Sequence, residues 1–132
     1  MENANPIIYR QADLAENYLA DRPYQSGTVL MFGGDAEVTL AATYTKSVAG
    51  VVSTGPAQIM NGALQGTNVV AIALKGRVPC NVVGPVKKGD LLVSAGFGYA
   101  RTNNNAESGT VIGKAITDYP GSGKAVIEIL VV

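Results

Sequence analysis

The sequence predicts an all-β fold, a compact barrel or sandwich of about nine short strands, and two observations support it. Short runs rich in Val, Ile and Leu recur along the chain, and turns that contain Gly, Pro or Asn separate most of them. A similar pattern also occurs twice, in residues 27–74 and again in residues 89–131. Neither pseudo-repeat is expected to bury its apolar face alone, so we expect the two to close on each other.

Residues 1–26 differ from the rest of the chain and are predicted to form an N-terminal arm with a short helix. The segment 13–20 contains good helix formers and no glycine. Leu14 and Tyr18, four residues apart, would share one helical face, and Asp13 would cap the helix at its N-terminus. Two helical turns are marginal alone, so we expect this segment to dock against something else.

The apolar residues before this predicted helix have two possible environments. Pro6, Ile7, Ile8 and Tyr9 are consecutive. They either pack on the β domain of their own chain or lie on a neighbouring subunit, and the sequence leaves both possibilities open. We expect residues 1–26 to reach a neighbour, and a chain lacking them to remain folded.

The β domain is predicted to span residues 27–132. In the first pseudo-repeat the glycines Gly27 and Gly50 mark the start of the unit and its third strand, and Gly89 and Gly113 do so in the second. The expected strands are residues 28–32, 37–42, 47–53, 69–74, 77–83, 90–94, 98–102, 110–116 and 124–131.

Two connections in this domain carry apolar side chains that we expect to be exposed. The long segment 55–68 holds Ile59 and Met60 in polar surroundings. The turn at residues 96–98 presents Phe97 between two glycines, and Tyr99 follows it.

Composition argues against several classes of function. The formal net charge is zero without a basic run, so the chain lacks the positive surface of a nucleic-acid-binding protein. No apolar run is long enough to span a membrane, and the polar N-terminus does not resemble a secretion signal. We therefore expect a protein made in the cytoplasm, without membrane or nucleic-acid partners.

Catalysis, cofactors and metal binding are not expected. The sequence contains no histidine, which excludes Ser-His-Asp and Cys-His arrangements and histidine metal ligands. Ser53 with Lys46 as its base is conceivable, but a serine that bonds its own turn is the simpler interpretation. The single cysteine, Cys80, is expected to be a small buried apolar residue.

Five segments, taken together and in order, resemble a known family. They are residues 14–18 (LAENY), 48–54 (VAGVVST), 73–79 (ALKGRVP), 86–94 (VKKGDLLVS) and 109–115 (GTVIGKA). The series resembles a β-rich module of tailed-bacteriophage structural proteins, which often forms the tip of a trimeric fibre. The resemblance extends over residues 13–132.

The resemblance implies a virion component that forms a homotrimer. Because this chain reaches the module within about twenty residues, without a shaft, it is more similar to small head-decoration (cement) proteins, which bind the major capsid protein on the capsid surface. A tail fibre-tip or receptor-binding module is the alternative. The candidate protein-interaction residues are Pro6, Ile7, Ile8, Tyr9, Leu14, Tyr18, Ile59, Met60, Phe97 and Tyr99.

Overall fold

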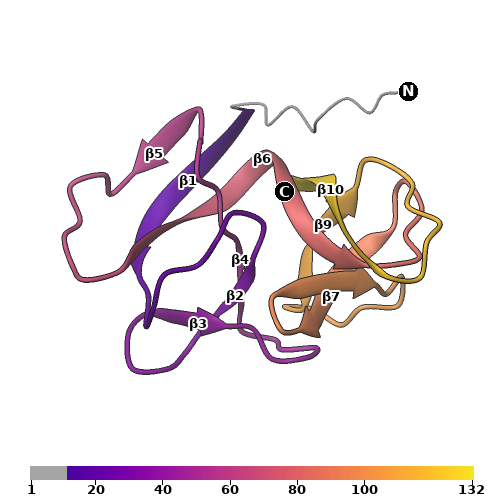
Figure 1. The fold of residues 1–132 in the computed structure, drawn as a ribbon, viewed down its shortest axis with the longest axis horizontal. Coiled ribbons are helices and arrows are strands. Elements are labelled where there is room, and N and C mark those ends of the chain that lie inside the picture. The colour runs from indigo at the N-terminus through magenta and orange to yellow at the C-terminus, as the bar shows by residue number, and fades with distance from the viewer. Residues whose placement is uncertain (1–11) are drawn as a thin grey trace.

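A computed structural model describes residues 12–132, and within this range the chain is all-β, as predicted, without a helix (Figure 1). Two bodies of strands lie side by side, and the long strand β6 (Val69–Val83) runs through both. We call them barrel one and barrel two. The chain enters barrel one first, and its C-terminal strand completes barrel two.

Barrel one contains β1 (Ala12–Leu19), β2 (Val29–Phe32), β3 (Val38–Leu40), β4 (Val48–Val51) and the first half of β6. β2 pairs antiparallel with β3 and β4, and β1 pairs antiparallel with β6. Two bridges, Ala20 with Val38 and Val52 with Ile72, join these two groups of strands. The five strands therefore form a closed ring, in which each strand has a neighbour on both sides.

Barrel two contains the second half of β6, β7 (Leu91–Gly96), β8 (Tyr99–Thr102), β9 (Val111–Ala115) and β10 (Lys124–Val131). The strand order is β10-β9-β7-β8-β6, and an additional antiparallel pairing of β10 with β6 closes the ring. A parallel bridge joins Val82 of β6 to Ala100 of β8, just as Ala20 joins Val38 in barrel one.

Equivalent glycines start the two units in the same way. Gly27 and Gly89 both have φ of 90°, a conformation that glycine adopts without steric cost. The Gly27 N–H donates to the carbonyl oxygen of Val52 over 2.9 Å, and the Gly89 N–H donates to that of Ala115 over 2.8 Å. The two barrels thus share local geometry as well as strand order.

The glycines of the third strand in each unit allow close packing. A Cβ atom at Gly50 would lie 2.8 Å from Cγ2 of Ile72, and one at Gly113 would overlap the carbonyl oxygen of Leu130. In both barrels the neighbour is the strand that closes the ring. A side chain at either position would force this strand away.

The core consists of two packed clusters rather than one. Leu30, Val38 and Ile72 belong to the interior of barrel one. Val29, next to Leu30 on β2, instead packs with the cluster of barrel two. Both faces of β2 are therefore buried at its start, one inside barrel one and one against barrel two, which explains why this segment begins with consecutive apolar residues.

The predicted helix at residues 13–20 is wrong, because this segment is strand β1. Seven of its eight residues from Asp13 onward match consecutive partners on β6, interrupted by one bulge between Leu14 and Ala15. Pairing with β6 along the whole strand, and with β5 over residues 14–16 on the other edge, satisfies many of its backbone groups. Two isolated helical turns, by contrast, are marginal in water. β1 takes the place in barrel one that the second half of β6 takes in barrel two.

Two further differences from the expected strands concern β5 and β6. The windows 69–74 and 77–83 are one strand, which passes between the barrels at Gly76 with φ of 107°. β5 (Gln58–Met60) is an additional strand in the long segment expected to be a loop, and it pairs parallel with β1. Each pseudo-repeat thus closes its own ring while sharing β6.

Candidate interaction surface

The predicted interaction residues of the N-terminal region fall into two groups. Pro6, Ile7, Ile8 and Tyr9 lie outside the described residues. Leu14 and Tyr18 lie half-buried on β1.

Tyr18 contributes to the packing of barrel one. Its ring meets that of Phe32 edge-on, with centroids 5.5 Å apart, and it packs against the core cluster of this barrel. Burial, with the negative charge of Glu16 adding to it, raises the pKa of the Tyr18 hydroxyl. The structure therefore shows a packing role for Tyr18, and its contact with a partner stays a prediction.

Ile59 and Met60 lie on β5 at the edge of the seven-stranded sheet. Their side chains are 45% and 42% exposed. A groove of about 570 Å³ borders Ile59, and all of its lining residues are uncharged, including Asn17, Tyr24 and Ser53. This end of barrel one offers an apolar edge next to neutral hydrogen-bonding groups.

Phe97 is the most exposed large apolar residue described, at 86% of its surface, in the turn between β7 and β8. Its φ of 56° is uncommon for a bulky side chain, and the flanking glycines Gly96 and Gly98 also have positive φ. Backbone bonds to barrel one fix both sides of the turn: the Val29 N–H donates to the Gly98 carbonyl and Tyr44 N–H to that of Ser94, each over 3.0 Å. A strained, exposed aromatic residue on a fixed turn is typical of a contact residue.

Next to Phe97, two cations lie over aromatic rings. The Lys124 Nζ lies 4.9 Å from the ring centroid of Tyr99, and the Arg101 Cζ lies 5.8 Å from that of Tyr44. Sequence analysis identified Tyr99 but missed its three companions. The alternation of Tyr99 and Arg101 on β8 could have revealed Arg101, whereas Tyr44 and Lys124 come from distant segments.

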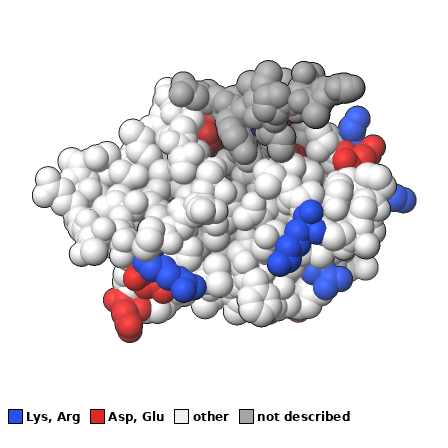
Figure 2. Space-filling view, viewed as in Figure 1, with Lys and Arg blue, Asp and Glu red and all other residues white. Residues whose placement is uncertain are grey.

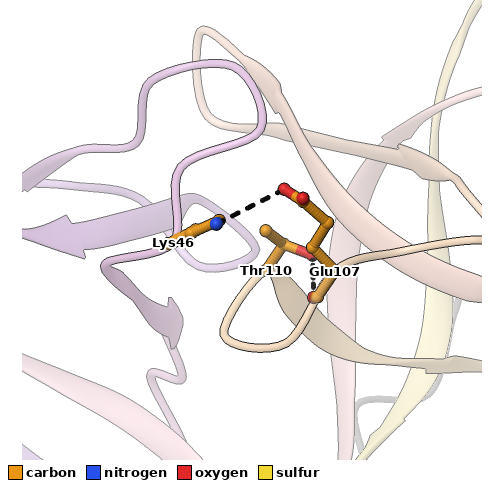
Figure 3. A network of polar contacts seen from close by, with 3 residues as sticks. All are labelled: Lys46, Glu107 and Thr110. Atoms are coloured by element: carbon orange, nitrogen blue, oxygen red, sulfur yellow. Dashed lines mark hydrogen bonds and ion pairs between the residues drawn. The ribbon is translucent and has the colours of Figure 1, made fainter.

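The structure gives Ser53 and Lys46 separate structural roles. Ser53 is buried after β4, and its N–H donates to the carbonyl oxygen of Ala71 over 2.9 Å. The Lys46 Nζ lies 3.6 Å from Oε1 of Glu107, so equivalent loops of the two barrels meet there (Figure 3). In the same loop the Thr110 hydroxyl donates to the Glu107 carbonyl over 2.6 Å. Because both charged side chains are largely exposed, this ion pair contributes at most about 1 kcal/mol.

Asp90 organises the turn that opens barrel two. Its carboxylate accepts hydrogen bonds from the Asn104 side-chain amide (3.0 Å), the Lys87 N–H (2.8 Å) and the Thr102 hydroxyl (2.9 Å). These donors, the Asn104 amide foremost, lower the pKa of Asp90 below its usual value. The arrangement ties the turn before β7 to the end of β8 and the loop that follows it, and leaves Asp90 a structural carboxylate.

Cys80 is fully buried, as predicted, and burial raises the pKa of its thiol to about 12. Within residues 12–132, no group of three or more cysteine, aspartate or glutamate side chains is arranged to hold a metal ion. In the same range there is no helix that could cross a membrane.

Charged side chains are sparse on the face seen in Figure 2. They gather in a few places, and a broad uncharged surface lies between them. Such a surface suits contacts that exclude water, because few charges have to lose their hydration.

A search of solved structures finds a bacteriophage protein with the same fold. The match is the pre-mature form of bacteriophage phi29 gene product 12, with a TM-score of 0.67 and 11% sequence identity. It covers 99% of this chain but only 23% of the phi29 protein, so the fold is one part of a longer chain there. No family model matches the sequence, and no curated protein is similar to it in sequence.

Proposed function

We propose that this chain is a non-enzymatic structural protein of a bacteriophage virion. The observation that carries the proposal is the recurrence of nearly its whole fold inside a bacteriophage gene product. The five sequence segments that resemble phage structural modules support the same class independently. The structural roles of Ser53, Lys46 and Asp90 agree with a scaffold rather than a catalyst.

Within that class, we propose a head-decoration role on the capsid surface. The exposed apolar residues are spread over both barrels, at Ile59 and Met60 on one and at Phe97 on the other. Several modest contacts, repeated at every lattice position, stabilise a capsid by avidity without high affinity at any one site. The partners in this proposal are the major capsid protein and two further copies of the chain in a homotrimer.

A tail fibre-tip or receptor-binding module is the second candidate. One observation favours it: the matching fold in the phi29 protein is a segment of a longer chain, as a module would be. In this case the exposed Phe97 turn would face a receptor rather than a neighbour in the capsid.

The number of copies per virion separates the two candidates. We expect quantitative mass spectrometry of purified particles, with the major capsid protein as internal standard, to find hundreds of copies, since decoration follows the capsid lattice. A few copies, released together with isolated tails, would support the fibre-tip candidate instead. A virion without the polypeptide would contradict the structural role altogether.

A further inference from the structure

The outer face of barrel two carries two cations, each held on an aromatic ring. Tyr99 and Arg101 occupy alternate positions of β8, so their side chains leave the same face of the sheet. Lys124 of β10 covers the ring of Tyr99, and Arg101 itself covers the ring of Tyr44 from barrel one. Together with Phe97 in the turn of the β7–β8 hairpin, these five residues form what we call the β8 row.

The rings in this row support the cations rather than offering free stacking surfaces. A cation held over a ring loses part of its side-chain freedom before any ligand arrives, which lowers the entropic cost of binding. The guanidinium of Arg101 keeps N–H donors at its edge, which suit the two oxygens of a carboxylate. The ion pairs within residues 12–132 are Lys46 with Glu107 and Arg77 with Glu128, and neither uses a cation of the row.

The row is also bounded on both sides by features that a ligand could use. At its Arg101 end lies a cavity of about 270 Å³, which Val83, Pro85 and Thr102 help to line. At its other end stands Phe97, exposed over 86% of its surface. The row thus begins at the exposed side chain of Phe97, continues with the two cations and ends at a small cavity.

We propose that the β8 row binds an extended acidic peptide segment of a partner protein. Side chains two apart on a strand repeat about every 6.6 Å, and the same repeat separates alternate side chains of an extended peptide. Lys124 of β10 lies over the ring of Tyr99, which is two positions before Arg101 on β8. Carboxylates at alternate positions of the peptide would therefore meet Lys124 at Tyr99 and then Arg101, with an apolar side chain against Phe97. The inference rests on the proposed function, because it names the chemistry of the virion partner.

The binding test uses the full chain and a capped peptide in which glutamate alternates with threonine, followed by one leucine. Isothermal titration at low salt is expected to show one site, with affinity falling as salt rises. The same peptide with glutamine in place of glutamate is expected to bind at least about tenfold more weakly. Equal binding of both peptides would overturn the proposal.

Variants locate the site. Arg101→Gln with Lys124→Gln is expected to weaken peptide binding about tenfold, because both charged contacts are lost. The control, Lys87→Gln with Lys88→Gln, removes the same charge from an exposed turn and is expected to change affinity less than about twofold. Tyr44→Leu keeps the Arg101 charge but removes its support, and an effect of about threefold is expected. An equal loss of peptide affinity in the Lys87→Gln and Lys88→Gln control would mean that only the net charge of the protein matters. This result would contradict the proposed site.

A second probe tests the class of partner. Hyaluronate oligosaccharides present carboxylates on a sugar backbone, and we expect them to bind the row more weakly than the peptide. Tighter binding of hyaluronate, lost in the Arg101→Gln and Lys124→Gln variant, would replace the peptide by an acidic saccharide and overturn the proposal. Failure of peptide binding leaves the copy number per virion unchanged, so the failures of this inference and of the proposed function are distinguishable.

Discussion

At the scale of single residues, the turns of this protein are fixed by unusual backbone conformations and by side chains that bond the backbone. Tyr44 and Phe97 both have φ near 57°, and a backbone hydrogen bond joins Tyr44 to the strand that leads to Phe97. Strain of this kind costs about 1 kcal/mol per residue and persists only where the surroundings enforce it. Here the contact between the barrels enforces it and places two aromatic side chains at the surface.

Asp90 gives a prediction of pH dependence. Its pKa in the folded protein lies below the usual value, so the unfolded chain binds the proton more readily. The stability that Asp90 provides is therefore present above its unfolded pKa of about 4 and is lost as the pH falls through the lowered value. Asp90→Asn is expected to be less stable at pH 7 and to show a weaker loss of stability below about pH 4.

Urea unfolding between pH 7 and pH 3, followed by circular dichroism, measures this effect. Asn104→Ala removes the foremost donor and is expected to weaken the same acid dependence while keeping the carboxylate. Asn105→Ala, on the neighbouring exposed position, is the matched control and is expected to follow the wild-type curve. An Asp90→Asn curve parallel to the wild type over the whole range would contradict the assignment.

At the scale of elements, β1 and β6 decide how the chain closes. β6 supplies one half to each barrel, and β1 completes barrel one by pairing with its first half. The segment first expected to be part of a detachable arm is therefore built into the sheet. Of the segment expected to be the arm, residues 12–19 form β1, and the residues before Ala12 lie outside the described range.

Two truncations test this distinction. Removal of residues 1–20 takes away β1, opens barrel one and exposes the Val70 and Ile72 side of its core, so we expect loss of cooperative unfolding. Removal of residues 1–11 leaves every described strand in place and is expected to keep a cooperative transition in urea. The shorter truncation is also the correct test of the proposed arm: decoration of empty capsids by it at wild-type occupancy would contradict an arm that reaches a neighbour.

At the scale of the whole molecule, a shared strand and a shared core cluster join the two barrels. They share β6, and Val29 and Val51 of barrel one pack in the same cluster as Leu92 and Ile129 of barrel two. Opening either ring exposes part of the core of the other. A domain that carries exposed apolar side chains at several separate places is suited to contacting more than one neighbour in an assembly.

We therefore predict that both barrels unfold in a single transition. The thiol of Cys80 reports on barrel two, since burial and a pKa of about 12 keep it unreactive at pH 8 until the protein unfolds. A second protein, Cys80→Ala with Val38→Cys, places the reporter in the core of barrel one. In each protein, the free energy of unfolding from urea-dependent thiol labelling is expected to equal that from circular dichroism. Labelling of Val38→Cys at urea concentrations that leave the circular dichroism unchanged would show independent barrels.

The sequence by itself determined the all-β class, most strand positions and the marker glycines. These features are local: apolar runs, turn residues and positive-φ glycines act within a few residues of chain. Gly27 and Gly89, for example, are recognisable as equivalent starts before any pairing is known.

Only the tertiary structure decided the fate of β1, the sharing of β6 and the assembly of the β8 row. Residues 13–20 carry a helical pattern that is overridden once β6 offers backbone partners along one whole edge of the strand. Tyr44 and Lys124 flank β8 because two rings close and dock, which brings Tyr44, 57 positions before Arg101, and Lys124, 25 positions after Tyr99, to this strand. Local pattern selects the type of element, whereas the partner available across space selects its pairing, and surface sites depend on that pairing.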